Sequence, residues 1–180
     1  MGIRTSNTSD VIFEDMRVPA SSMIGEEGTG FFTCMKTLDI TRALMGIGAT
    51  GIMQRCIDEA VAYSKQRVTF GQPIGKFQAI QFMIADMEIK TETARQMSLH
   101  AMKLMEEGLP YSKESAIAKC YAGDMAVQVA LDAIQILGGY GYSREYPVEK
   151  LLRDAKIFQL YEGTNQIQRI VISRAVMGKF

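Results

Sequence analysis

Helical periodicity from Gly30 onward is the feature that most limits how this chain can fold. Apolar or small residues recur at three- and four-residue spacing, as in Ile52, Cys56 and Ala60, with charged residues between them. The interruptions are short and contain glycine or proline: VTFGQPIG, EEGLP and the GG of QILGGYGY. The pattern therefore predicts helices over about residues 30–67, 77–106 and 111–137, a shorter helix after residue 147 and a last one from about residue 164.

Long helices joined by short breaks favour an all-α fold, an up-down four-helix bundle. The first stretch, GIRTSNTSDVIFEDMRVP, is different, because its turn-forming residues and the β-branched and aromatic run VIF predict one or two strands. A lone hairpin is at best marginally stable in water. Either this segment packs on the helices, or the rest of its sheet is missing from this chain.

Composition excludes several classes of function. With 180 residues, 47% of them hydrophobic, the chain can form one domain with a sizeable core. The 20 basic residues equal the 20 acidic ones, so no charge excess points to nucleic acid or to an anionic membrane. Three scattered cysteines and one histidine favour reduced thiols over disulfides or a metal site. No apolar run reaches membrane-spanning length. These features indicate a reducing compartment.

The segment LYEGTNQIQR places Glu162, Gly163 and Thr164 just ahead of the last predicted helix. An acidic side chain before a helix is stabilised by the helix dipole and by unpaired N–H groups, so Glu162 could serve only the helix start. Alternatively, it is a catalytic carboxylate. The decapeptide alone leaves both interpretations open.

Four other segments carry candidate site residues. In RVTFG, Arg67 beside Thr69 could hold a pyrophosphate, or it could simply end a helix. The glycines of QILGGYGY could let the backbone approach a ligand, or they could form a helix end and a turn. Gln78 in FQAIQF could bind a ligand or be solvated. The acid and base of LDITR would ordinarily form a surface ion pair.

Taken together, the motifs RVTFG, FQAIQF, IAKCYAGDMA, QILGGYGY, EYPVEKLLRDAKI and YEGTNQIQR resemble the C-terminal helical domain of the acyl-CoA dehydrogenases. The resemblance covers essentially the whole chain and is to the short- or medium-chain type. It implies that residues 1–25 are the end of that family's middle β-domain, with a β-strand remnant. Residues 26–180 would form the helical bundle.

The resemblance also implies a reaction. Family members use FAD to oxidise an acyl-CoA thioester to the trans-2-enoyl thioester, and the glutamate of the YEG motif, here Glu162, removes the α proton. A subset carries its base at a position that matches Thr41. Such chemistry requires a site that excludes water and stabilises charge on the thioester oxygen. The implied substrate contacts are Asp39, Thr41, Arg42, Tyr161 and Gly163.

The implied cofactor contacts form two sets. Thr164, Asn165 and Gln166 follow the base and would meet the FAD. The second set resembles positions that reach the FAD of a neighbouring subunit, so assembly would be part of cofactor binding: Arg67, Thr69, Phe70, Gln78, Gln135, Gly138 and Gly139. The family resemblance implies a homotetramer, a dimer of dimers, with electron-transferring flavoprotein as the usual acceptor. It places the protein in a bacterial cytoplasm or the mitochondrial matrix.

An alternative function remains open at this level. Family enzymes are about twice as long as this chain, and their other domains cover the flavin and the substrate. The chain could therefore be a catalytically inert helical module for oligomerisation and for one edge of the cofactor. A helical scaffold that is not part of any enzyme is a third hypothesis.

Overall fold

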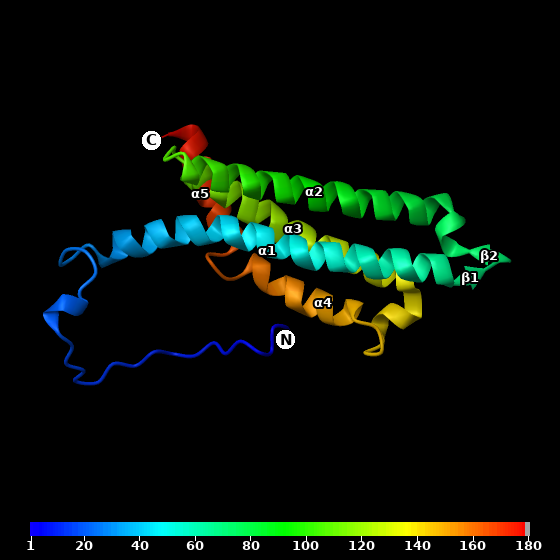
Figure 1. Ribbon diagram of the computed structural model, residues 1–180, viewed down its shortest axis with the longest axis horizontal. Helices are drawn as coiled ribbons and strands as arrows, with labels where there is room; N and C mark the ends of the chain where they lie inside the picture. Colours follow the sequence, from blue (N-terminus) through cyan, green and yellow to red (C-terminus); the bar gives the residue numbers. More distant parts are fainter. Residues whose placement is uncertain (179–180) are drawn as a thin grey trace.

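The computed structural model describes residues 1–178 and is mainly helical (Figure 1). Three long helices run alternately in opposite directions: α1 (Gly30–Gln66), α2 (Gln78–Glu106) and α3 (Ser112–Leu137). They pack on one another, as the apolar periodicity predicts. The fourth position of the bundle is shared by two shorter helices, α4 (Val148–Ala155) and α5 (Asn165–Met177), which both pack on α3. The predicted helical bundle is confirmed, with its fourth member split.

A small hairpin joins α1 to α2. Strand β1 (Val68–Thr69) pairs antiparallel with β2 (Gln72–Pro73). Phe70 and Gly71 form the two-residue loop, and both have positive φ, +53° and +79°. Two left-handed residues are what a tight hairpin turn of matching twist requires. The sequence indicated a break here but not a pair of strands.

The expected strand near Val11–Phe13 is not formed, and the expectation of a strand remnant there was wrong. The segment contains one short 3₁₀ turn (Ala20–Ser22), and the side chains of Val11, Ile12 and Phe13 are 72–76% exposed. An isolated strand has no neighbour to accept its backbone hydrogen bonds, so local β propensity does not suffice.

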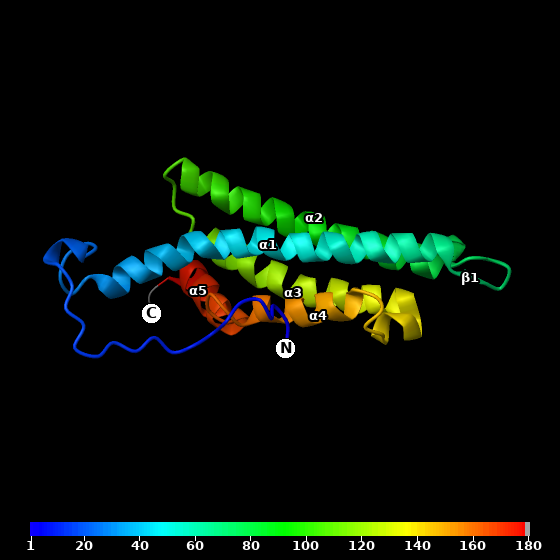
Figure 2. The ribbon, with the colours of Figure 1, turned by 60° about the horizontal axis from the view of Figure 1, so that its bottom comes forward.

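Only the beginning of this segment is attached to the bundle. The Ile3 backbone N–H donates to Asp154 Oδ1 at 2.6 Å, and the Arg153 guanidinium donates to the Met1 carbonyl at 2.9 Å. Figure 2 shows the first residues beside α4 and the rest of the segment running away from the bundle before it turns into α1. The N-terminal segment therefore contacts the bundle near the end of α4.

Small residues allow the three long helices to pack closely. A Cβ added at Gly46 on α1 would lie 2.3 Å from Ser98 Oγ on α2 and 3.6 Å from the Ala118 backbone on α3. Alanine, methionine and valine side chains fill the core around this crossing. Glycine in a helix lowers its intrinsic stability by roughly 1 kcal/mol against alanine, and here close helix packing offsets that cost.

Two general findings bear on function. Among residues 1–178, no helix combines the length and the apolar composition that crossing a bilayer requires. Within the same residues, no group of three or more His, Cys, Asp or Glu side chains is arranged to hold a metal ion.

Candidate active site and cofactor edge

Glu162 lies in a tight turn between a 3₁₀ turn (Lys156–Gln159) and α5. Its φ is +56°, and Gly163 follows with φ +85°. Left-handed backbone at a residue with a Cβ costs roughly 1–2 kcal/mol and occurs where surrounding contacts enforce it. Thr164 caps α5, because its Oγ1 accepts from the Ile167 N–H at 3.3 Å. The side-chain cap of α5 is therefore Thr164 and not Glu162.

The carboxylate of Glu162 meets a hydroxyl from α1. Thr41 Oγ1 donates to Glu162 Oε2 at 2.6 Å. The neighbouring Arg42 is 6% exposed, donates through Nε to the Glu162 carbonyl at 3.4 Å and pairs with Asp39 at 2.5 Å. The three candidate substrate residues of LDITR thus lie at the YEG turn. Arg42 belongs to a buried network and not to the ordinary surface pair considered above.

Two buried side chains hold the carbonyls of the turn. Gln168 on α5 donates through Nε2 to the carbonyls of Glu162 and Gly163, at 3.2 and 2.9 Å. Lys119 on α3 donates to the Gly163 carbonyl at 2.7 Å. Gln168 Oε1 is buried and has no partner among the described residues, so one acceptor is left unsatisfied while the amide nitrogen holds the turn. Among residues 1–178, the Glu162 backbone N–H has no acceptor.

Lys119 and Gln168 were missed by sequence reasoning. Lys119 lies within IAKCYAGDMA, where a charged residue occupies a position of the helix that faces the core. A lysine in register with buried apolar residues is unusual enough to serve as a signal. Burial lowers the pKa of Lys119 to about 8, and the nearby Arg42 acts in the same direction.

Asn165 connects the turn to α3. Its Oδ1 accepts from Lys119 at 2.9 Å, and its Nδ2 donates to the Cys120 carbonyl at 3.0 Å and to Asp124 Oδ1 at 2.8 Å. The amide group is thus fully engaged inside the domain. Of the three predicted FAD contacts here, Thr164 is half-buried and Gln166 is exposed, so these two remain open to a ligand.

Tyr161 faces a cavity beside the turn. This cavity has a volume of about 330 Å³, and Ile3, Ser6 and Thr8 of the N-terminal segment contribute to its wall. The Tyr161 ring packs edge-on against Phe158, with centroids 5.3 Å apart. Burial and the negative charge of Glu162 raise the pKa of Tyr161 to about 12, so its hydroxyl stays protonated at neutral pH. The acyl-side contact of Tyr161 stays a prediction.

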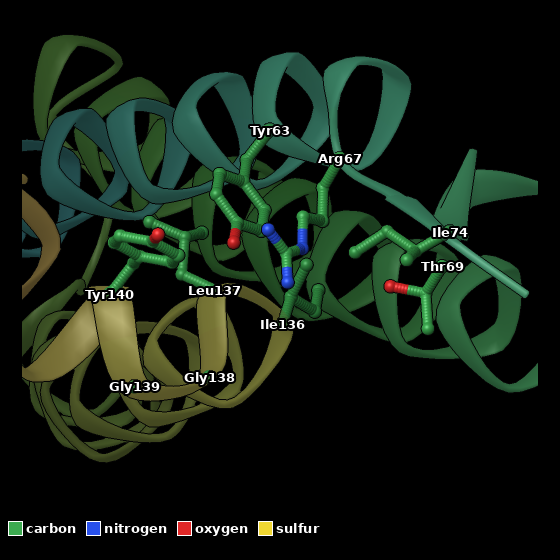
Figure 3. A pocket seen from close by; sticks show the side chains of 9 residues that line it. All are labelled: Tyr63, Arg67, Thr69, Ile74, Ile136, Leu137, Gly138, Gly139 and Tyr140. Carbon is green, nitrogen blue, oxygen red and sulfur yellow. The ribbon is translucent and has the colours of Figure 1, made fainter.

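A cavity of about 480 Å³ lies at the other end of α1 (Figure 3). Four predicted cofactor residues line it together: Arg67, Thr69, Gly138 and Gly139. The Arg67 guanidinium lies over the Tyr140 ring, 5.7 Å from its centroid. The cavity is not lined by the three other predicted residues of this set. Phe70 is 92% exposed at the hairpin tip, and Gln78 and Gln135 are exposed on their helices.

This cavity has the chemistry of an anion and aromatic-ring site. A guanidinium fork and a hydroxyl can donate to phosphate oxygens. Gly138 has φ +61°, and a Cβ added at Gly138 or Gly139 would meet nothing within 4 Å, so the backbone there is open to a ligand. The residues present therefore fit one edge of a dinucleotide such as FAD. We call this region, lined by Arg67, Thr69, Gly138 and Gly139, the cofactor edge.

The cofactor edge and the YEG turn are far apart within one chain. Thr41 and Arg67 are 26 residues apart on the same helix, which corresponds to about 39 Å along its axis. The two regions therefore lie well apart along α1.

Comparison with known proteins decides the family. Residues 28–177 match the family model described as "Acyl-CoA dehydrogenase, C-terminal domain". The chain belongs to the acyl-CoA dehydrogenase family. An acyl-CoA dehydrogenase of Bacillus subtilis is 48% identical over 178 residues, which are 99% of this chain and 47% of that protein. The chain spans about half the length of the curated relatives it matches.

Solved structures of the family have the same fold. Butyryl-CoA dehydrogenase from Megasphaera elsdenii superposes with a TM-score of 0.91 at 49% identity, over 92% of this chain and 43% of that one. A chain from a structure described as the electron transferring flavoprotein of Acidaminococcus fermentans gives a TM-score of 0.91 at 52% identity, over 93% of this chain and 44% of that one. These similarities confirm the resemblance to the helical domain of the acyl-CoA dehydrogenases.

Proposed function

We propose that the protein is an FAD-dependent acyl-CoA dehydrogenase in which Glu162 removes the α proton of an acyl-CoA thioester. The observation that carries the proposal is the contact between Thr41 and Glu162. A carboxylate on a left-handed turn, beside a donor from a different helix, is built at a strain cost that a helix start does not require.

The residues of the turn divide the work of proton removal. The Glu162 carboxylate takes the proton, and the Thr41 hydroxyl orients its Oε2. The Glu162 backbone N–H, which has no acceptor among the described residues, would donate to the thioester oxygen as negative charge develops there. Bound FAD supplies the acceptor for the β-hydride. Gly163 allows Gln168 to approach the turn, because a Cβ there would lie 2.8 Å from Gln168 Nε2, and Tyr161 would close the acyl side.

FAD binding would involve two chains. Thr164 and Gln166 lie beside the base and would meet the cofactor of their own active site. The cofactor edge would reach the FAD of a neighbouring subunit, and the separation of about 39 Å along α1 supports this division. We therefore propose an assembly of subunits, with the homotetramer as its form and residues 26–180 as the helical domain.

The relatives suggest substrate, partner and location. Similarity to a butyryl-CoA dehydrogenase favours a short straight acyl chain. Similarity to a chain from an electron transferring flavoprotein structure favours that flavoprotein as acceptor. The relatives named above are bacterial, which favours a bacterial cytoplasm over the mitochondrial matrix.

The test is Glu162→Gln in the full-length natural protein. The variant should retain FAD at the wild-type stoichiometry but lose flavin bleaching by acyl-CoA, because glutamine has the shape of the base without its basicity. Glu106→Gln, an exposed glutamate at the end of α2, is the matched control and should bleach normally. Normal bleaching by Glu162→Gln would remove Glu162 from the mechanism.

The second candidate function is an inert helical module that contributes the cofactor edge to a larger protein. The YEG turn is only half-buried in the 180-residue chain, since residues 161–164 are all partly exposed, and this favours the module for that chain alone. Gel filtration after incubation with FAD separates the two. Near one FAD per chain in a multimer supports a self-sufficient cofactor platform, and a folded chain without FAD supports the module.

A further inference from the structure

Lys119 is a deeply buried lysine whose ammonium contacts the YEG turn. Only 1% of its surface is exposed, and its ammonium bonds the Gly163 carbonyl at 2.7 Å and Asn165 Oδ1 at 2.9 Å. Taking an ammonium out of water costs several kcal/mol, and an apolar side chain would fill the same space without that cost. A lysine at this position therefore calls for an explanation beyond packing.

With the bond from Lys119, hydrogen bonds fix the orientation of two consecutive peptide planes in the turn. The Glu162 carbonyl belongs to the first plane and is held by Arg42 and Gln168. The Gly163 carbonyl belongs to the second and is held by Lys119 and Gln168. Because a peptide unit is planar, holding a carbonyl also sets the direction of the N–H on its other side. Both left-handed residues are thereby kept in place.

The charge of Lys119 acts on the same turn. The charged and titratable groups around it are Cys120 and Asp124 on α3, Arg42 on α1 and Glu162 on the turn. Glu162 and Asp124 favour the ammonium, whereas Arg42 disfavours it. The ammonium is therefore held at the turn by its hydrogen bonds and by the negative charges of Glu162 and Asp124.

We infer that Lys119 is a positioning residue for the α-proton abstraction: its ammonium holds the Gly163 carbonyl and keeps Glu162 beside Thr41. This inference rests on the proposed role of Glu162. Lys119 does not touch the substrate, so its effect passes through the turn.

Two substitutions separate the bond from the charge. Lys119→Met removes both with a side chain of similar length. Lys119→Gln removes the charge and keeps a neutral donor. Lys90→Met is the matched control, because Lys90 pairs with Asp132 at 2.8 Å, and Asp132 lies 13 residues from Lys119 on α3, about 20 Å along the axis.

The primary experiment is stopped-flow flavin reduction by acyl-CoA in the full-length protein, normalised to bound FAD and measured across pH. Lys119→Met should lower the limiting rate on the order of 10- to 100-fold, as expected for a base displaced by a fraction of an ångström to an ångström, with substrate affinity little changed. Lys119→Gln keeps a neutral donor for the Gly163 carbonyl and should therefore recover most of the rate.

A second readout does not depend on turnover. Hydrogen exchange of the peptide covering residues 158–168 should be faster in Lys119→Met than in wild type, and unchanged in Lys90→Met. Wild-type rate and exchange in Lys119→Met would overturn the inference. If Lys119→Met yields no folded protein, Lys119→Gln decides, and a rate far below wild type with unchanged exchange of residues 158–168 in that variant overturns the inference.

The outcomes distinguish this inference from the proposed function. If Glu162→Gln reduces flavin normally, the proposed function fails whatever Lys119 does. If Glu162→Gln is inactive and both Lys119 variants match wild type, only the role of Lys119 is refuted.

Discussion

The hydroxyl of Thr41 donates a 2.6 Å hydrogen bond to the carboxylate of Glu162, although 121 positions separate the two residues in the chain. The resemblance to the acyl-CoA dehydrogenases places an alternative base position of the family at Thr41. The contact explains how a base on either element could serve one reaction, because side chains from α1 and from the YEG turn reach the same point.

Thr41→Val should impair the base without removing it. A hydrogen bond to a carboxylate contributes about 1.5–3 kcal/mol when it is well shielded, and less at this half-buried position. The limiting rate of flavin reduction should therefore fall by up to about 10-fold, because the carboxylate is no longer oriented by the hydroxyl. Thr41→Ser keeps the hydroxyl and should behave like wild type. An unchanged rate in Thr41→Val would mean that the bond does not orient the base.

Arg67→Met should weaken FAD binding at the cofactor edge. Loss of a charge-assisted bond to phosphate costs about 1.5–3 kcal/mol, which corresponds to roughly a 10- to 100-fold weaker Kd. Arg67→Lys keeps the charge without the planar fork and should be intermediate. Arg55→Met, an exposed arginine on the same helix paired only with Glu59, is the control. The readout is fluorescence titration of the apoprotein with FAD; equal Kd values for the Arg67 and Arg55 variants would contradict the assignment.

Gly46→Ala should destabilise the bundle. The new Cβ would lie 2.3 Å from Ser98 Oγ, so α1 and α2 must separate or Ser98 must move, and overpacking of this kind costs about 1–3 kcal/mol. Gly51→Ala lies on the same helix with open space around the new Cβ and should gain about 0.5–1 kcal/mol from helix propensity. Chemical denaturation measures both changes. Equal effects of the two substitutions would show that α1 and α2 do not pack closely at Gly46.

Lys119 should make stability depend on pH in the alkaline range. Burial lowers its pKa from 10.5 to about 8 in the folded protein. Between these values the unfolded chain binds more protons than the folded one, so the free energy of unfolding contributed by Lys119 rises as the pH increases from 8 to 10.5. Below pH 8 the buried charge destabilises the folded protein fully, and above pH 8 this destabilisation decreases as Lys119 loses its proton.

The measurement is the melting temperature of wild type and of Lys119→Met at several pH values from 7 to 10.5. The melting temperature of wild type minus that of Lys119→Met should increase with pH, because the other titrating groups contribute equally in both proteins. A difference that stays constant across this range would show that the ammonium is not penalised by burial.

The sequence alone determined most of the secondary structure. The predicted helices end within a residue or two of α1, α2 and α3, because apolar spacing and the glycine and proline breaks act through local backbone preferences. The motifs also placed the YEG glutamate and the residues of the cofactor edge among the candidate site residues, and these assignments stay predictions. The strand expected near Val11–Phe13 does not form, since a strand exists only through hydrogen bonds to a partner.

Tertiary structure decided how the candidate site is held together. The sequence could not show that Thr41 reaches Glu162, that Lys119 and Gln168 hold the carbonyls of a left-handed turn, or that Asn165 is occupied by α3. Helix periodicity depends on neighbours three and four residues away, whereas the partner of a buried polar group depends on which helix faces it after packing. The chain therefore encodes its helices locally and the geometry of the candidate site only through the packing of α1, α3 and α5 around one turn.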